Sequence, residues 1–187
     1  MATRQINGLD VPTAGTFTLD PAHTRVGFVA RHLMVSKVRG SFTKVSGEIV
    51  VAENPAESTV HVSLDVESIT TGVEQRDGHL RSGDFFELEK HPTIEFNSTG
   101  VTLGSGNEFT LNGTLTIKDT TLPVSLDGEF EGIVTSPYGK EVFGFSASTE
   151  IDREDWGITY NMALETGGVM ISKNVKIEIE GEAIRND

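Results

Sequence analysis

Hydrophobic and polar residues alternate along most of the chain. Val60, Val62 and Leu64 alternate with His61 and Ser63, which predicts a β-strand with one buried face and a solvent-facing His61. The same period of two predicts further strands in these segments: 16–19, 25–31, 46–51, 93–103, 109–117, 122–130, 143–151 and 175–179. Short runs rich in Gly, Asn, Asp, Ser and Pro separate them, which is typical of an antiparallel meander.

We therefore predict an all-β fold, an extended antiparallel lipocalin-like β-barrel of about eight strands with one or two short helices. Closure into a barrel removes the exposed edges of such a meander. Helix formers in 75–86 predict a short helix with a loop, and 33–40 is expected to hold a further turn of helix. Residues 1–15 are expected to be a flexible arm, followed by one barrel domain over 16–187.

The predicted inner faces mix large apolar residues with small ones. Gly113, Gly128, Gly132, Gly144 and Ala147 share these faces with Val, Leu and Phe. An eight-stranded barrel is just wide enough to be filled by side chains or to hold one small ligand. Small inward residues favour a cavity, although strand glycines also mark bends and bulges.

Composition and charge exclude several classes of protein. The 187 residues contain no cysteine, so disulfides and thiolate chemistry are ruled out. The net charge of −13 argues against nucleic-acid binding. No apolar run is long enough for a transmembrane segment. No secretory signal precedes the first strand, which predicts a cytoplasmic protein.

The residues that usually carry catalysis or bind metals form no known motif. None of the five histidines lies three or four residues from another, as a helical metal site requires. Nucleophile-elbow and nucleotide-binding motifs are missing as well. We expect no catalytic residues, no metal and no cofactor, and therefore a protein that is not an enzyme.

One segment reverses the overall charge. Residues 21–47 contain five basic residues and no acid: Arg25, Arg31, Lys37, Arg39 and Lys44. They could attract an anionic headgroup, a membrane surface or an acidic partner. Alternatively, acids on neighbouring strands neutralise them.

Several stretches in a fixed order resemble the YceI-like family, also called polyisoprenoid-binding-like proteins. They begin with Asp20-Pro21-Ala22-His23-Thr24 and continue through 31–42 to the most distinctive one, Arg76-Asp77-Gly78-His79-Leu80-Arg81-Ser82-Gly83-Asp84-Phe85-Phe86. His91-Pro92-Thr93-Ile94-Glu95-Phe96, 113–117 and Asp152-Arg153-Glu154-Asp155-Trp156-Gly157-Ile158 follow. Trp156 stands where the family usually has phenylalanine, and His91 where it has tyrosine.

The resemblance implies a non-catalytic carrier whose apolar barrel channel holds a polyisoprenoid, a prenylquinone or a similar long-chain acyl lipid. Many members of the family are exported, and some are homodimers. Aromatic and flexible thioether side chains suit an apolar channel. We expect its lining to include Phe28, Met34, Phe42, Leu80, Phe85, Phe86, Phe96, Phe145, Trp156, Tyr160, Met162 and Met170. His32, Arg76 and His79 are the candidates for contacting a polar headgroup.

Two other functions remain open. The barrel could be filled by its own side chains and act as an interaction or stress-response domain without a lipid. It could also present a prenylated quinone to a redox enzyme.

Overall fold

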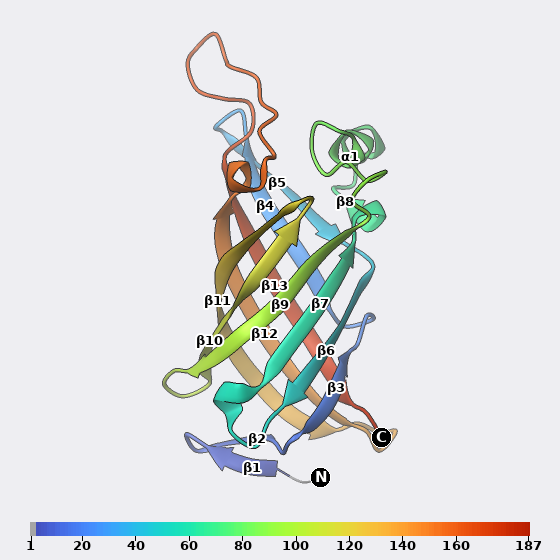
Figure 1. Cartoon of the computed structure of the whole chain (residues 1–187), viewed down its shortest axis with the longest axis vertical. Helices are drawn as coiled ribbons and strands as arrows, with labels where there is room; N and C mark the ends of the chain where they lie inside the picture. The colour runs from blue at the N-terminus through green and yellow to red at the C-terminus, as the bar shows by residue number, and fades with distance from the viewer. Residues whose placement is uncertain (1–2) are drawn as a thin grey trace.

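The alternating segments form the wall of an elongated antiparallel barrel (Figure 1). The structure, a computed structural model, describes residues 3–187. The strands are β1 Thr3–Ile6, β2 Leu9–Pro12, β3 Gly15–Leu19, β4 Arg25–His32, β5 Ser36–Phe42, β6 Val45–Val51, β7 Thr59–Asp65, β8 Ile69–Thr70, β9 Thr93–Leu103, β10 Glu108–Ile117, β11 Thr120–Thr135, β12 Glu141–Asp152 and β13 Asn174–Arg185. The helices are α1 Glu74–Arg81 and the 3-10 turns η1 Pro55–Glu57, η2 Val66–Ser68 and η3 Arg153–Trp156.

Within the described residues, eight strands close the ring in the order β12-β11-β10-β9-β7-β6-β3-β13, and β12 pairs with β13. Every pairing is antiparallel, as predicted. β13 pairs with β3 through Ala183 to Arg185 and with β4 through Lys176 to Glu180. The β4–β5 hairpin therefore extends the wall beyond the ring, and β8 adds to its edge.

The barrel has two different ends (Figure 1). We call the end that carries α1, η3, the β4–β5 turn and the 157–173 loop the helix end. The opposite end, with β1, β2, η1 and the C-terminus, is the hairpin end. Among residues 3–187, no helix is both long and apolar enough to cross a bilayer.

The all-β class and the barrel are confirmed, and α1 (Glu74–Arg81) overlaps the segment 75–86 in which a short helix was predicted. The turn of helix expected in 33–40 is wrong, because a tight turn is followed there by strand β5. Val38, Gly40 and Phe42 alternate along β5, but glycine at the middle position hides the apolar pattern. The ring of Phe28 from β4 covers Gly40.

Residues 3–12, expected to belong to a flexible arm, form the β1–β2 hairpin. Asn7 and Gly8 have φ values of 52° and 79°, which suits a two-residue turn of the type that favours Asn-Gly. The Arg4 guanidinium donates to the Ala52 carbonyl at 2.7 Å, and the Asn7 amide donates to the Gly104 carbonyl at 3.2 Å. The hairpin is thus attached to the end of the barrel.

Fully buried apolar side chains gather near both ends. At the hairpin end, Phe17 packs edge-on against Phe143 with ring centroids 4.9 Å apart. At the helix end, Val66 and Ile69 are each 1% exposed and belong to the same buried cluster as Trp156. These packed groups hold the two ends of the barrel in shape.

Candidate ligand-binding cavity

An apolar cavity of about 400 Å³ lies inside the barrel. Inward-facing residues of successive strands line it, such as Phe96 of β9, Leu111 of β10, Leu126 of β11, Ala147 of β12 and Ile177 of β13. Its volume falls in the range of small-molecule sites, which are mostly apolar with few polar groups. The filled-barrel alternative requires that the protein's own side chains fill the interior completely. The cavity shows that they do not.

Four phenylalanine rings of the lining lie over glycines of the adjacent strand. The pairs are Phe28 with Gly40, Phe96 with Gly113, Phe109 with Gly128 and Phe145 with Gly181. A methyl group on Gly181 would come within 2.7 Å of Phe145 Cζ, which is closer than van der Waals contact. Because each glycine leaves space beside the strand, its partner ring occupies wall rather than lumen. Of the small residues noted in the sequence, Gly113 and Gly128 thus keep the cavity open and Ala147 lines it, whereas Gly132 and Gly144 lie outside the lining.

Different elements line the two ends of the cavity. Leu80, Phe85 and Phe86 reach it from α1 and the segment that follows, and Ile158 and Ile171 from the 157–173 loop. At the hairpin end, the lining includes apolar residues of β1 and β2, namely Ile6, Leu9, Val11 and Pro12. The hairpin therefore contributes part of the site, which the sequence analysis did not anticipate.

Arg153 is a charged residue in this lining that the sequence analysis did not select. Phe143, Phe145, Ala147, Thr149 and Ile151 of β12 face inward, and the same alternation leads to position 153. The side chain is 6% exposed. Extending the alternation of β12 by two residues would have identified it.

The guanidinium of Arg153 binds backbone carbonyls of the 157–173 loop. Nε donates to Ser172 O at 2.9 Å and Nη1 donates to Ile158 O at 2.7 Å. Burial lowers the pKa of Arg153 below its ordinary value. Arginine remains charged at neutral pH even so, because its ordinary pKa is very high. Arg153 thus ties the two arms of the loop together and places a cation at the helix end.

Arg4 places a second cation at the hairpin end of the lining. Its two Nη atoms donate to the Ala52 and Glu53 carbonyls. Nε is buried and has no hydrogen-bond partner among residues 3–187. The apolar cavity therefore has a guanidinium at each end.

Seven of the residues predicted to line the channel do so: Phe28, Phe42, Leu80, Phe85, Phe86, Phe96 and Phe145. They come from four strands, α1 and the segment after it. The structure thus brings together most of the aromatic residues that the sequence analysis selected.

The other predicted lining residues lie elsewhere. Trp156 is 4% exposed but packs beside the cavity, where its indole N–H donates to Leu115 O at 3.0 Å. Met34 and Met162 are 53% and 55% exposed at the helix end. The Met170 N–H donates to the Met162 carbonyl. The Tyr160 ring packs edge-on against the His79 ring, with the ring centroids 4.9 Å apart. None of these five residues belongs to the lining of the cavity.

The three residues proposed for a polar headgroup also lie outside the lining. Arg76 is exposed and donates to the Thr71 hydroxyl at 2.7 Å. His79 is hydrogen-bonded to Asp84 at 2.8 Å. His32 forms an isolated β-bridge with Ile171. The Arg76 and His79 side chains thus interact with residues of the helix end, and the bridge of His32 is made by its backbone.

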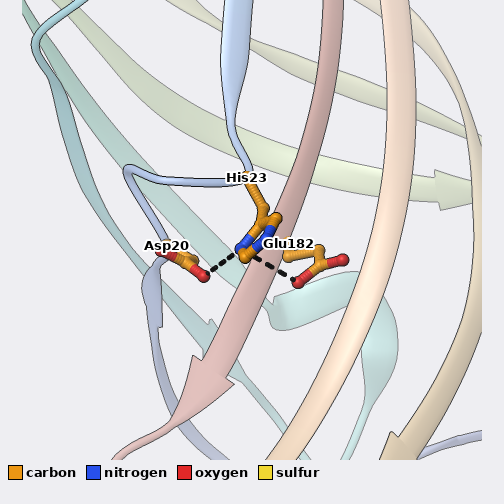
Figure 2. A group of neighbouring side chains, drawn as sticks. All are labelled: Asp20, His23 and Glu182. Atoms are coloured by element: carbon orange, nitrogen blue, oxygen red, sulfur yellow. Dashed lines mark hydrogen bonds and ion pairs between the residues drawn. The ribbon is translucent and has the colours of Figure 1, made fainter.

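A separate polar cluster lies on the outside of the wall. His23 Nδ1 is 2.6 Å from Asp20 Oδ2 and 3.7 Å from Glu182 Oε2 (Figure 2). The hydrogen bond raises the pKa of His23, with a further contribution from Glu182, and it lowers the pKa of Asp20. The geometry is that of an ion pair between the β3–β4 connection and β13.

Comparison with known proteins identifies related sequences. A family model described as YceI-like domain matches residues 17–183. UPF0312 protein SA2479 of Staphylococcus aureus strain N315 is 42% identical over 169 residues, which cover 89% of this chain and 95% of the relative. UPF0312 protein SAV2687 of strain Mu50 matches to the same extent.

Solved structures share the fold. A Campylobacter jejuni YCEI protein is 30% identical, with a TM-score of 0.73, over 84% of this chain and 90% of that chain. Burkholderia cenocepacia BcnA has a TM-score of 0.77 at 19% identity, over 88% of this chain and 98% of that chain. A polyisoprenoid binding domain from Saccharophagus degradans has a TM-score of 0.69 at 15% identity, over 93% and 100%.

Proposed function

Because the chain belongs to the YceI-like family, we propose that it binds one long isoprenoid chain in its barrel and carries or buffers it. The observation that carries the proposal is the cavity, which has apolar residues along its walls and reaches elements of both ends. Such a shape suits a long flexible hydrocarbon better than a compact ring system. The proposal assigns binding and transport to this protein, without a catalytic step.

Burial of the hydrocarbon supplies the binding energy. Each buried CH₂ contributes about 0.8 kcal/mol, from which the costs of ordering the chain and losing its free motion are subtracted. A long chain can therefore bind without a strong headgroup contact. The aromatic lining provides large apolar area with few rotatable bonds.

Two features support an isoprenoid over a straight acyl chain. The phenylalanine rings make an uneven wall, which suits a hydrocarbon with a methyl branch in every unit. The fold is also shared with the Saccharophagus degradans domain, which is described as binding polyisoprenoid. A prenylquinone combines such a chain with a ring headgroup and stays within the same proposal.

Native mass spectrometry tests the proposal directly. The protein is measured as purified and after loading with geranylgeraniol, a menaquinone or palmitate, each supplied separately. We expect one bound molecule per chain, with geranylgeraniol retained more strongly than palmitate. Preference for palmitate would replace the isoprenoid with an acyl lipid, and recovery of apo protein in every case would refute the proposal.

A matched pair of variants tests whether the ligand binds inside the barrel. Ala147 faces the cavity from β12, whereas Glu150 on the same strand is exposed. Ala147→Trp should abolish loading because its ring occupies the lumen, and Glu150→Trp should leave loading unchanged. Circular dichroism confirms that both variants keep the β-barrel. Equal loading of both would show that the chain binds elsewhere.

A further inference from the structure

Four exposed apolar side chains lie together at the helix end. Leu33, Met34 and Val35 in the β4–β5 turn are 40%, 53% and 80% exposed, and Met162 in the 157–173 loop is 55% exposed. Backbone hydrogen bonds connect the two segments, since Leu33 N donates to Met170 O and Met170 N donates to Met162 O. Figure 1 shows the turn and the loop side by side. We call Leu33, Met34, Val35 and Met162 the apolar tip.

The turn that exposes these side chains is strained. Leu33 and Met34 have φ values of 52° and 62°, in the left-handed region that side chains with a Cβ rarely adopt. A tight turn with two such residues normally contains Asn and Gly, as the Asn7-Gly8 turn of this chain does. Leu33 and Met34 are only partly buried, so burial offsets the strain only in part. Backbone strain of this kind is characteristic of functional sites.

Positive charge without an ion-pair partner in the described part of the chain lies on the β4–β5 hairpin beside the apolar tip. Arg31 lies directly opposite Lys37 in the β4–β5 hairpin, and Arg39 follows on the same face. Among residues 3–187, none of these three forms an ion pair within 4.0 Å. Like charges that face each other across strands are destabilising.

The rest of the basic segment has acidic neighbours. Arg25 lies opposite Glu180, and Lys44 is 3.8 Å from Asp65. Neutralisation by neighbouring strands thus applies to part of the segment only, and attraction of an anionic partner stays a prediction for the rest. An acid pairs with Lys44 and another lies opposite Arg25 in the sheet register, whereas the three residues beside the apolar tip have no ion-pair partner among residues 3–187.

We propose that the apolar tip, with Arg31, Lys37 and Arg39, docks this protein on the surface of an anionic lipid bilayer. The inference rests on the proposed function, because a carrier of a membrane-soluble chain must take it from a bilayer. Apolar side chains enter the interface while lysine and arginine bind anionic headgroups. The chain as a whole carries a net charge of −13, so its field favours an approach to an anionic membrane through this basic region.

Vesicle sedimentation tests the docking. The full chain is mixed with vesicles of phosphatidylcholine alone or with 30% phosphatidylglycerol. We expect binding to the anionic vesicles that is at least tenfold stronger than binding to the neutral ones. Binding should fall steeply as salt is raised, since the ionic contribution is screened. Equal binding to both vesicles, or none to either, overturns the proposal.

Replacement of the turn separates docking from folding. Leu33→Asn with Met34→Gly supplies the residues that the backbone favours, so we expect Tm to be unchanged or raised by a few degrees. Binding to anionic vesicles should fall about tenfold or more. If binding is retained, or if the variant loses both stability and binding, the two residues have no docking role of their own.

Two further variants test charge and position. Arg31→Gln with Lys37→Gln should weaken binding to anionic vesicles by about fivefold for each charge. Val134→Asn with Tyr138→Ser changes one exposed apolar residue of β11 and one of the β11–β12 turn, both at the hairpin end, and should leave vesicle binding unchanged. An equal loss in both variants would overturn a site at the helix end.

Loading with geranylgeraniol from dilute solution, without vesicles, distinguishes this inference from the proposed function. Loading without vesicle binding overturns docking and leaves the carrier proposal standing. Vesicle binding without loading does the reverse. Analytical ultracentrifugation tests the alternative that the apolar tip binds a second copy of the chain. A dimer that Leu33→Asn with Met34→Gly converts to monomers would overturn the membrane proposal.

Discussion

The two ends of the barrel are closed in different ways. At the hairpin end, a continuous β1–β2 hairpin covers the lining and is attached through Arg4 to backbone carbonyls. At the helix end, α1, η3 and the 157–173 loop converge, and the buried Arg153 holds the loop through its carbonyls. The hairpin is regular and its turn is relaxed, whereas the helix end carries a strained turn and exposed apolar residues.

This difference indicates a division of roles between the ends. Regular strands with a favoured turn give a stable cover. Irregular segments held by a few side-chain bonds open more easily, because local stability follows the number of buried contacts and backbone hydrogen bonds. The proposed ligand would therefore pass through the helix end.

The largest expected effect follows from removal of the helix-end anchor. Arg153→Met leaves the Ser172 and Ile158 carbonyls without their donor, and should lower the free energy of unfolding by about 3 kcal/mol. Urea denaturation measures this loss. Arg4→Met, at the more exposed anchor of the hairpin end, should cost about 1 kcal/mol. An equal cost for both would contradict the asymmetry between the ends.

A smaller effect is expected from glycines that lie under aromatic rings. Gly40→Ala on β5 near the helix end and Gly128→Ala on β11 should each push their partner rings into the lumen. Overpacking of this kind costs about 1–3 kcal/mol. Both variants should also retain less geranylgeraniol in native mass spectra. Unchanged loading in both would show that the rings do not define the width of the cavity.

Deletion of the hairpin tests the cover itself. A chain that starts at Thr13 should keep its barrel and lose about 1 kcal/mol of stability, because lost burial is offset by the freed chain entropy. Hydrogen exchange should increase at β6, β7 and the β9–β10 turn while the helix end stays protected. Increased exchange mainly at the helix end would reverse the roles of the two ends.

The smallest effect is expected from the ion pair between His23 and Asp20 on the outside of the wall. Because the pKa of His23 is raised, its stabilisation is present below its ordinary value of 6.5 and is lost as pH rises through the raised pKa. Because the pKa of Asp20 is lowered, the stabilisation that Asp20 contributes is present above its ordinary pKa of 3.8 and is lost as pH falls through the lowered pKa. His23→Gln should therefore reduce Tm most between these limits. A constant difference across the pH range would show that the ion pair is not its cause.

The sequence predicted the wall of the barrel better than its ends. Alternation identifies inward residues such as Phe96 and Phe145 because the side-chain period of a strand does not depend on distant contacts. The β5 strand was missed because Gly40 interrupts that alternation. The β1–β2 hairpin does have a local signal, because Asn7-Gly8 is a pair that favours a two-residue turn.

The ends depend on tertiary contacts that no local pattern contains. Trp156 packs beside the cavity because its indole reaches a carbonyl at the end of β10. Met34 and Met162 have apolar side chains, yet the turn and loop that carry them project outward. Arg153 was overlooked because a charged residue is not expected inside an apolar barrel, although the period of β12 leads directly to it.

The pairing of phenylalanine with glycine has a consequence for how such barrels diversify. A ring and the gap beneath it come from two adjacent strands, so exchanging the two residues would move the ring by one strand without changing the total side-chain volume. A few exchanges of this kind would change where along its length the cavity is narrowest. The cavity would then limit the length of the hydrocarbon chain that it holds, and relatives with the same backbone would select chains of different lengths.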